Sequence, residues 1–227
     1  MHSLTGALGL VFLPVQRLTA TVLAASDAPE NEKKLVQAAQ IIQSEEDKKE
    51  MQALRDQFDT KSVSAQNLTP SEVVGYGGYI PGASSARTLV IDKGSADGLK
   101  KGQAVVYKDN LVGVITKVSM HSSLVTLLGA KDLSFTATTS SADASGVVKG
   151  FEDGLVMDNI VLSEKIEKGD LVVTKGDMTL EGTGFPPGLV IGQVEKSEKK
   201  QSDIFQKAYL KSLLDFNSLR TVFVINS

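Results

Sequence analysis

Alternating apolar and polar positions organise the chain around residues 93–118. Residues 103–108 (QAVVYK) have the composition of a strand, and residues 111–118 place three valines on one face of a second strand. Asp109 and Asn110 stand between the two as a tight-turn signal. The pattern predicts a β-hairpin.

This hairpin pattern occurs twice in the chain. Residues 99–106 (LKKGQAVV) recur as 166–173 (IEKGDLVV), and 111–113 (LVG) recurs within 189–192 (LVIG). The offset grows from 67 residues at the first matched glycine to 79 at the second, so the second copy has a loop longer by 79 − 67 = 12 residues. A repeated supersecondary unit predicts two similar small β-domains rather than one large sheet.

The strand pattern continues from residue 86 to the C-terminus, and closure into two small barrels would remove its exposed edges. We expect a first β-barrel at residues 63–132 and a second at 133–227, unless the last strands return to complete the first barrel. Residues 61–70 are expected to be a polar linker, and 71–83 an irregular edge strand with a loop. The expected strands are residues 86–92, 103–108, 111–118, 123–129, 134–139, 145–149, 159–162, 171–175, 188–195, 205–211 and 219–225.

The N-terminal residues 1–27 form an apolar segment that Pro14, Gln16 and Arg17 interrupt. A membrane-spanning helix needs roughly 20 apolar residues in a row. The pattern therefore favours an amphipathic, membrane-proximal helix over a span.

A long helix is predicted at residues 28–62, because Asp27 and Glu30 form a capping box at its start. Its apolar positions recur at spacings of three and four in two runs, which the polar residues 44–50 separate. This is the pattern of a short coiled coil, and we expect the helix to mediate self-association. The residues expected in that contact are Leu35, Ile42, Met51, Leu54 and Phe58.

Composition narrows the function classes. A net charge of −3 argues against a nucleic-acid binder, which would show a basic face. The chain has no cysteine, which excludes a disulfide scaffold, thiol catalysis and cysteine metal sites. Two histidines are too few for a histidine-rich metal centre. We expect no cofactor, no metal and no small-molecule substrate.

Two tandem barrels raise the question of a chymotrypsin-like hydrolase, which would place His, Asp and Ser across a cleft. Serines of the second half, such as Ser163 and Ser197, lack the neighbouring glycines that would form an oxyanion-binding loop. We therefore expect no catalytic residue and no enzymatic activity. The remaining triad candidates are His121 with Asp132, Asp143 or Asp153.

The glycine-rich loop at residues 182–188 lacks the Lys-Ser/Thr pair of a phosphate-binding loop and leads into a strand, so it is interpreted as a rigid turn. Several other glycines punctuate the strands and are expected to serve the backbone. The expected structural glycines are Gly94, Gly98, Gly102, Gly113, Gly146, Gly169, Gly188 and Gly192.

Several motifs in order resemble the bacterial rod shape-determining protein MreC family. They are the run at 91–128, ASGVVKG at 144–150, KGDLVVTKG at 168–176 and FPPGLVIGQVEK at 185–196, with the PVQ segment at Pro14–Gln16 ahead of them. The resemblance covers residues 70–225 closely and residues 1–60 by pattern only.

The resemblance implies a single-pass protein of the cell membrane whose bulk is extracytoplasmic. Its fold would be all-β with an N-terminal helix, the two barrels having a protease-like topology without catalytic residues. It would be a scaffold of the cell-elongation complex that organises peptidoglycan synthesis. Its partners would be further copies of itself, membrane proteins of that complex and a peptidoglycan transpeptidase.

A second class of function is a periplasmic adaptor of a transport assembly, which also joins helices to small β-barrels. That class requires two antiparallel helices of similar length, and the sequence predicts a single long helix on the N-terminal side. The scaffold interpretation is therefore preferred, with the adaptor as the alternative and a two-barrel serine hydrolase as the least favoured.

Overall fold

The computed structural model describes residues 68–80, 83–152, 154–199 and 202–226, and this part of the chain is all-β apart from one 3₁₀ turn at Ser95–Asp97. The expected apolar segment at 1–27, the helix at 28–62 and its five self-association residues lie outside the described residues and remain predictions. The strands are β1 Leu68–Gly77, β2 Thr88–Ile91, β3 Ala104–Tyr107, β4 Asn110–Val118, β5 Ser123–Leu127, β6 Ser134–Thr139, β7 Ser145–Phe151, β8 Gly154–Val161, β9 Leu171–Thr174, β10 Asp177–Met178, β11 Gly184–Phe185, β12 Val190–Glu198, β13 Phe205–Lys211 and β14 Thr221–Ile225.

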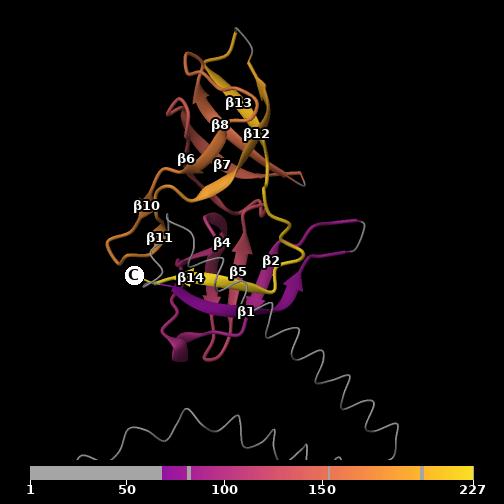
Figure 1. Ribbon diagram of the computed structural model, residues 1–227, viewed down its shortest axis with the longest axis vertical. Helices are drawn as coiled ribbons and strands as arrows, with labels where there is room; N and C mark the ends of the chain where they lie inside the picture. The colour runs from indigo at the N-terminus through magenta and orange to yellow at the C-terminus, as the bar shows by residue number, and fades with distance from the viewer. Residues whose placement is uncertain (1–67, 81–82, 153, 200–201, 227) are drawn as a thin grey trace, which may run out of the picture. The chain divides into compact units, whose positions relative to one another are not determined.

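Strand pairing closes two rings. The first barrel has the order β4-β3-β14-β1-β2-β5, and β5 pairs back onto β4. The second has the order β13-β8-β7-β6-β9-β12, and β12 pairs back onto β13. The two rings join where β12 runs parallel to β4, through the pair Val190 and Asn110. Figure 1 shows the first barrel below and the second above.

The sequence repeat corresponds to a structural repeat. In the first barrel the Gly102 N–H donates to the Ile115 carbonyl at 2.8 Å. In the second barrel the Gly169 N–H donates to the Val194 carbonyl, also at 2.8 Å. Both glycines have positive φ, 91° and 98°, a conformation that a side chain disfavours. In each copy of the repeat, the turn before the first strand is therefore hydrogen-bonded to the second strand in the same way.

Of the two arrangements left open for the end of the chain, the structure has the one in which the last strand returns to the first barrel. Strand β14 pairs with β1 and β3 and so belongs to the first barrel, where its yellow ribbon lies among purple and magenta strands (Figure 1). Strand β6 occupies the matching position in the second barrel, between β7 and β9. The first barrel has no such strand of its own among residues 68–127, and without β14 the edges of β1 and β3 would be unpaired.

The structure also differs from the expected polar linker at residues 61–70 and the expected irregular edge strand at residues 71–83. Residues 68–77 form a ten-residue strand with neighbours on both sides, β14 and β2. Pro70 precedes Val73, where the pairing with β2 begins, so at Pro70 the strand has a neighbour only on the β14 side, an edge position in which a missing N–H is tolerated.

Strands β3, β4 and β14 of the first barrel bury side chains on both of their faces, which explains their nearly continuous apolar sequences. In β3, Val105 belongs to the core of the first barrel, whereas Val106 packs in the larger core that also fills the second barrel. In β14, Val222 and Phe223 divide in the same way. A strand covered on both faces has no need of polar alternation.

The longer loop of the second copy lies between β9 and β12 and carries the small β10–β11 hairpin. Its Phe185 is buried against Phe135, with ring centroids 4.7 Å apart. The Gly184 N–H donates to the Gly102 carbonyl of the first barrel at 2.7 Å. This insertion therefore fastens one barrel to the other.

Candidate protein-binding surface

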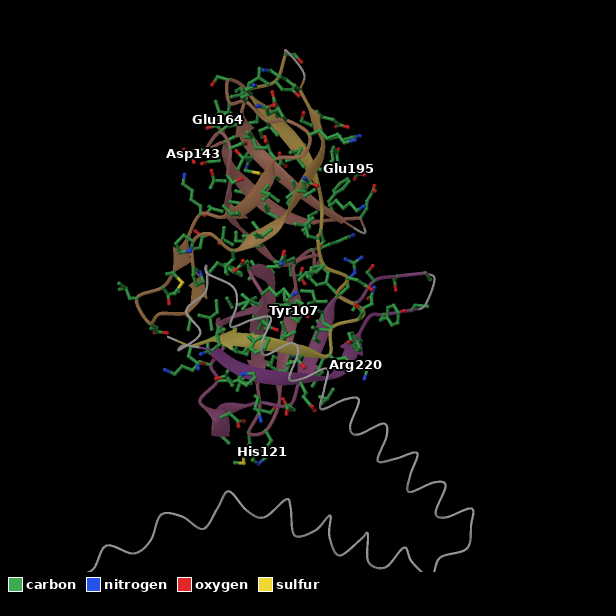
Figure 2. The ribbon with its side chains drawn as sticks, viewed as in Figure 1. Tyr107, His121, Asp143, Glu164, Glu195 and Arg220 are labelled. Atoms are coloured by element: carbon green, nitrogen blue, oxygen red, sulfur yellow. The ribbon has the colours of Figure 1, made fainter. Side chains whose placement is uncertain are left out.

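The residues considered for a catalytic triad are not brought together. His121 lies in the exposed turn between β4 and β5, and Asp143 lies in the turn between β6 and β7. Figure 2 shows these two side chains at opposite ends of the view. Asp132 lies in the connection from β5 to β6, Ser163 follows β8 and Ser197 lies on β12, whereas Asp153 is outside the described residues.

The eight expected structural glycines fall into two groups. Four have positive φ, and at the other four an added Cβ would lie 2.1 to 2.6 Å from a backbone oxygen. The first group is Gly98, Gly102, Gly169 and Gly188, and the second is Gly94, Gly113, Gly146 and Gly192. None of them forms a ligand cradle in this structure, and their role as structural positions stays a prediction that the substitution discussed below tests.

Within residues 68–226, as far as they are described, no group of three acidic or histidine side chains is placed to hold a metal ion. The same part of the chain contains no helix that is long and apolar enough to cross a membrane.

An aromatic patch covers part of the outer wall of the second barrel. We define it as Phe151, Tyr209, Lys196 and Glu198. The Phe151 and Tyr209 rings meet edge to face, with centroids 5.9 Å apart, and the Lys196 Nζ lies 4.6 Å from the Tyr209 centroid. An edge-to-face pair with a cation over one ring is a favourable arrangement of aromatic groups.

Strand alternation explains why these side chains gather on the outside. In β13 (FQKAYLK), the inner positions are buried and the alternate positions, among them Phe205 and Tyr209, face outward. Tyr209 stands directly opposite Lys196 in the register, next to a bulge between Val194 and Lys196. Phe151, at the end of β7, lies at the tip of the neighbouring hairpin and is 43% exposed.

Glu198 holds the patch in place. The Tyr209 hydroxyl donates to its carboxylate at 3.1 Å, and the Lys196 Nζ lies 2.9 Å from the other carboxylate oxygen. The hydrogen bond to Glu198 raises the pKa of Tyr209, and the hydrogen bond and charge of Glu198 raise the pKa of Lys196. Glu198 therefore favours the protonated, donor forms of both groups, which are already the forms present at neutral pH.

Beside the patch, Asp158 accepts from Lys149 at 3.0 Å and lies 3.6 Å from the Lys207 Nζ. Partial burial by itself would raise the pKa of Asp158. The hydrogen bonds from Lys149 and the Asn159 N–H, with the charges of Lys149 and Lys207, outweigh it and hold the pKa below its ordinary value.

We expect Asp158→Asn to lower the free energy of unfolding by up to about 1 kcal/mol at pH 7, because the ionised carboxylate is favoured in the folded state. A depressed pKa contributes stability above the unfolded pKa, near 3.9, and loses it as the pH falls through the folded value. Urea unfolding of both proteins from pH 7 down to pH 2 should therefore show the two stabilities converging in acid. A difference in the free energy of unfolding that stays constant over this pH range would contradict a lowered pKa of Asp158.

A pocket of about 300 Å³ opens between the two barrels. Arg87 bridges the barrels here, donating to the Gly129 carbonyl at 2.8 Å and to the Glu152 carbonyl at 3.3 Å. The Ala86 N–H donates to the Asn217 Oδ1 at 2.9 Å. The lining combines apolar Leu155, Leu214 and Phe216 with charged Arg87, Glu195, Lys211 and Asp215.

Sequence reasoning missed both the patch and the pocket. Phe205 and Tyr209 alternate along β13 with the buried residues, so they lie on its outward face. This alternation in the sequence could have indicated outward-facing aromatic side chains, whereas the overall composition could not. The pocket had no such signal, because its walls come from several separate segments: residues 85–87 just before β2, the start of β8, parts of β12 and β13, and the β13–β14 connection.

Comparison with known proteins identifies relatives of this fold. The model of the family "Rod shape-determining protein MreC, barrel core" matches residues 81–226. A cell shape-determining protein MreC of Listeria monocytogenes is 32% identical over 141 residues, covering 60% of this chain and 46% of that protein. The chain thus spans about half the length of this curated relative.

Solved structures agree with this match. A Listeria monocytogenes MreC structure has a TM-score of 0.61 at 27% identity, covering 86% of this chain and 93% of that one. A complex between the penicillin-binding protein PBP2 and MreC of Helicobacter pylori contains a chain with a TM-score of 0.54 at 20% identity, covering 70% of this chain and 96% of that one. The second likeness shows the fold alone.

Proposed function

Because the chain belongs to the rod shape-determining protein MreC family, whose barrel-core model matches residues 81–226, we propose that it is an extracytoplasmic scaffold of the bacterial cell-elongation complex. Its curated relatives are cell shape-determining proteins. The family is one of structural proteins, so the chain acts by holding partners rather than by catalysis.

The proposed partner is a peptidoglycan transpeptidase, which binds the aromatic patch. The structure of a relative in complex with PBP2 supports this class of partner. The observation that carries the proposal is that exposed Phe151 packs edge to face on the half-buried ring of Tyr209, whose hydroxyl is hydrogen-bonded to Glu198. Aromatic side chains are enriched among the residues that dominate binding energy at protein interfaces.

The remaining parts of the proposal concern the N-terminal residues. The apolar segment at 1–27 keeps the protein at the cell membrane, and the helix at 28–62 contributes to self-association and to contacts with other membrane proteins of the complex. The heptad-like spacing in the sequence supports this part.

Removing either aromatic ring of the patch should weaken transpeptidase binding. For Phe151→Ala and Tyr209→Ala we expect at least about 30-fold loss of affinity, which corresponds to a hot-spot contribution of about 2 kcal/mol. The measurement is calorimetric titration of the full chain with the extracytoplasmic part of a transpeptidase from the same organism.

Phe205→Ala provides a matched control, because Phe205 is 46% exposed on the same strand as Tyr209 and outside the patch. Its affinity should change less than about 3-fold. Equal losses for Phe151→Ala and Phe205→Ala would show that the patch is not the contact, and no binding by the unaltered chain would reject the partner.

A further inference from the structure

The pocket between the two barrels combines an apolar lining with charged groups. Leu155 and Leu210 of its lining are each 4% exposed, and Leu214 and Phe216 are half-buried. Concave sites with an apolar lining and a few polar groups are the usual binding sites of small molecules. The charged residues of the lining are half-buried or exposed and are Arg87, Glu195, Lys211 and Asp215.

Hydrogen bonds hold the walls of the pocket in place. The Ala86 N–H donates to the Asn217 Oδ1 at 2.9 Å, and the Asn217 N–H donates to the Asp215 Oδ1 at 3.0 Å. Arg87, which precedes β2 of the first barrel, donates to the Glu152 carbonyl in the β7–β8 turn of the second. The pocket is therefore formed before a ligand arrives, and a ligand in it would contact both barrels.

The lining holds two positive and two negative side chains, so its charges cancel. Lys211 of β13 and Glu195 of the adjacent strand β12 lie close to the same β-bulge, so one small molecule can reach both. Within the described part of the chain, neither of these two side chains forms a hydrogen bond or an ion pair. Glu195 acts on the nearby charge of Lys196, whose Nζ instead lies 2.9 Å from Glu198. A ligand with one charge of each sign can pair with both Lys211 and Glu195, whereas a singly charged ligand leaves one of them without a partner.

The volume of the pocket limits the size of its ligand. A cavity of roughly 150 Å³ with an apolar lining holds one benzene molecule. The pocket has a volume of about 300 Å³, so on this scale it has room for about 12 non-hydrogen atoms. A phenylalanine molecule is of this size, and so is a dipeptide of alanine.

We propose that the pocket binds a small zwitterion with an apolar side chain, of the class of free apolar amino acids and dipeptides. Its ammonium group pairs with Glu195, its carboxylate pairs with Lys211, and its apolar part contacts Leu155 and Phe216. The ligand is held without being transformed, so it is not a substrate. This inference goes beyond the proposed scaffold function and does not rest on it.

Saturation-transfer difference NMR of the full chain with L-phenylalanine tests the proposal. A ligand of about 12 non-hydrogen atoms in such a site is expected to bind with a Kd of about 1 mM. N-acetylphenylalanine lacks the positive charge and phenylalaninamide lacks the negative one, so each should bind about 5-fold more weakly. No saturation transfer to phenylalanine at about 10 mM, or equal binding of the three compounds, would overturn the proposal.

Two charge variants assign the ends of the ligand. In Glu195→Gln, the difference in affinity between phenylalanine and N-acetylphenylalanine should fall below about 2-fold. In Lys211→Gln, the difference between phenylalanine and phenylalaninamide should fall to the same extent. Lys207→Gln is the matched control, because Lys207 lies on β13 like Lys211 without lining the pocket, and it should keep both differences. Survival of both differences in all three variants would overturn the assignment of the pocket.

Gly129→Leu tests where the ligand binds. Gly129 lines the pocket, and an added Cβ there would meet no atom within 4 Å, so a larger side chain can occupy the pocket without displacing its neighbours. We expect this variant to bind phenylalanine at least about 10-fold more weakly, with an unchanged melting temperature. Undiminished binding would place the ligand outside the pocket and overturn the proposal.

Discussion

Gly113→Ala is expected to lower the free energy of unfolding by about 3 kcal/mol and the melting temperature by roughly 6–12 °C. Gly113 lies in β4 opposite Leu127 of β5. A Cβ at this position would stand 2.1 Å from the Thr126 carbonyl oxygen. Because that oxygen belongs to the backbone, the strand itself must move, and a closed ring of paired strands resists such movement.

Thermal and urea unfolding would measure this effect, with Gly75→Ala as the matched control. Gly75 also lies inside a strand of the first barrel, but an added Cβ would meet only Val90 side-chain atoms at 3.6 Å or more. The control should change stability by less than about 0.5 kcal/mol. Similar losses of stability for the two variants would mean that the close approach of the Thr126 carbonyl oxygen is not the reason why Gly113 must be glycine.

Phe223→Ala should be at least as damaging, with a loss of about 3–5 kcal/mol. Phe223 is 2% exposed in the middle of β14 and pairs with both Pro70 and Val106. The aromatic side chain packs in the larger core. The surrounding strands cannot move inward to fill the space that it would leave, because both barrels are closed by strand pairing. Removal therefore leaves a cavity.

Circular dichroism melts of the full chain would measure the change, and Phe205→Ala again serves for comparison because Phe205 is half exposed. A stability change under about 1 kcal/mol for Phe223→Ala would show that β14 is not a fixed part of the first barrel.

Local patterns predicted the positions of several strands well. The expected strands at 134–139 and 205–211 coincide with β6 and β13. The expected strand at 159–162 was too short and too late, since β8 runs from Gly154 to Val161. Asp158 and Asn159 are weak strand formers and interrupted the apolar pattern of this strand in the sequence. In the structure, Asp158 points outward to Lys149, and Asn159 takes a positive φ of 59°.

Long-range pairing was the part that local patterns could not supply. Residues 68–77 contain Pro70 and two glycines, which are weak strand formers. They form a strand because β14 and β2 offer hydrogen-bond partners on both sides. The partner β14 comes from the far end of the chain, so no local window contains the cause.

The candidate surface was missed for a related reason. Phe151 and Tyr209 are far apart in sequence and meet only because β7, β8 and β13 are neighbours in one ring. The resemblance to a family predicted the class of protein, whereas the pairing of strands is what places the aromatic patch and the pocket.

The placement of β14 has a consequence for how the chain acquires its structure. Glu72 lies on one side of a ladder whose other side, at Thr221, is synthesised 221 − 72 = 149 residues later. Until then β1 and β3 carry unpaired edges, although every strand of the second barrel has already emerged. Contacts of such long sequence separation form slowly and leave folding intermediates prone to aggregation. The first barrel begins to emerge before the second but is completed after it, so a nascent chain needs protection of those edges until β14 arrives.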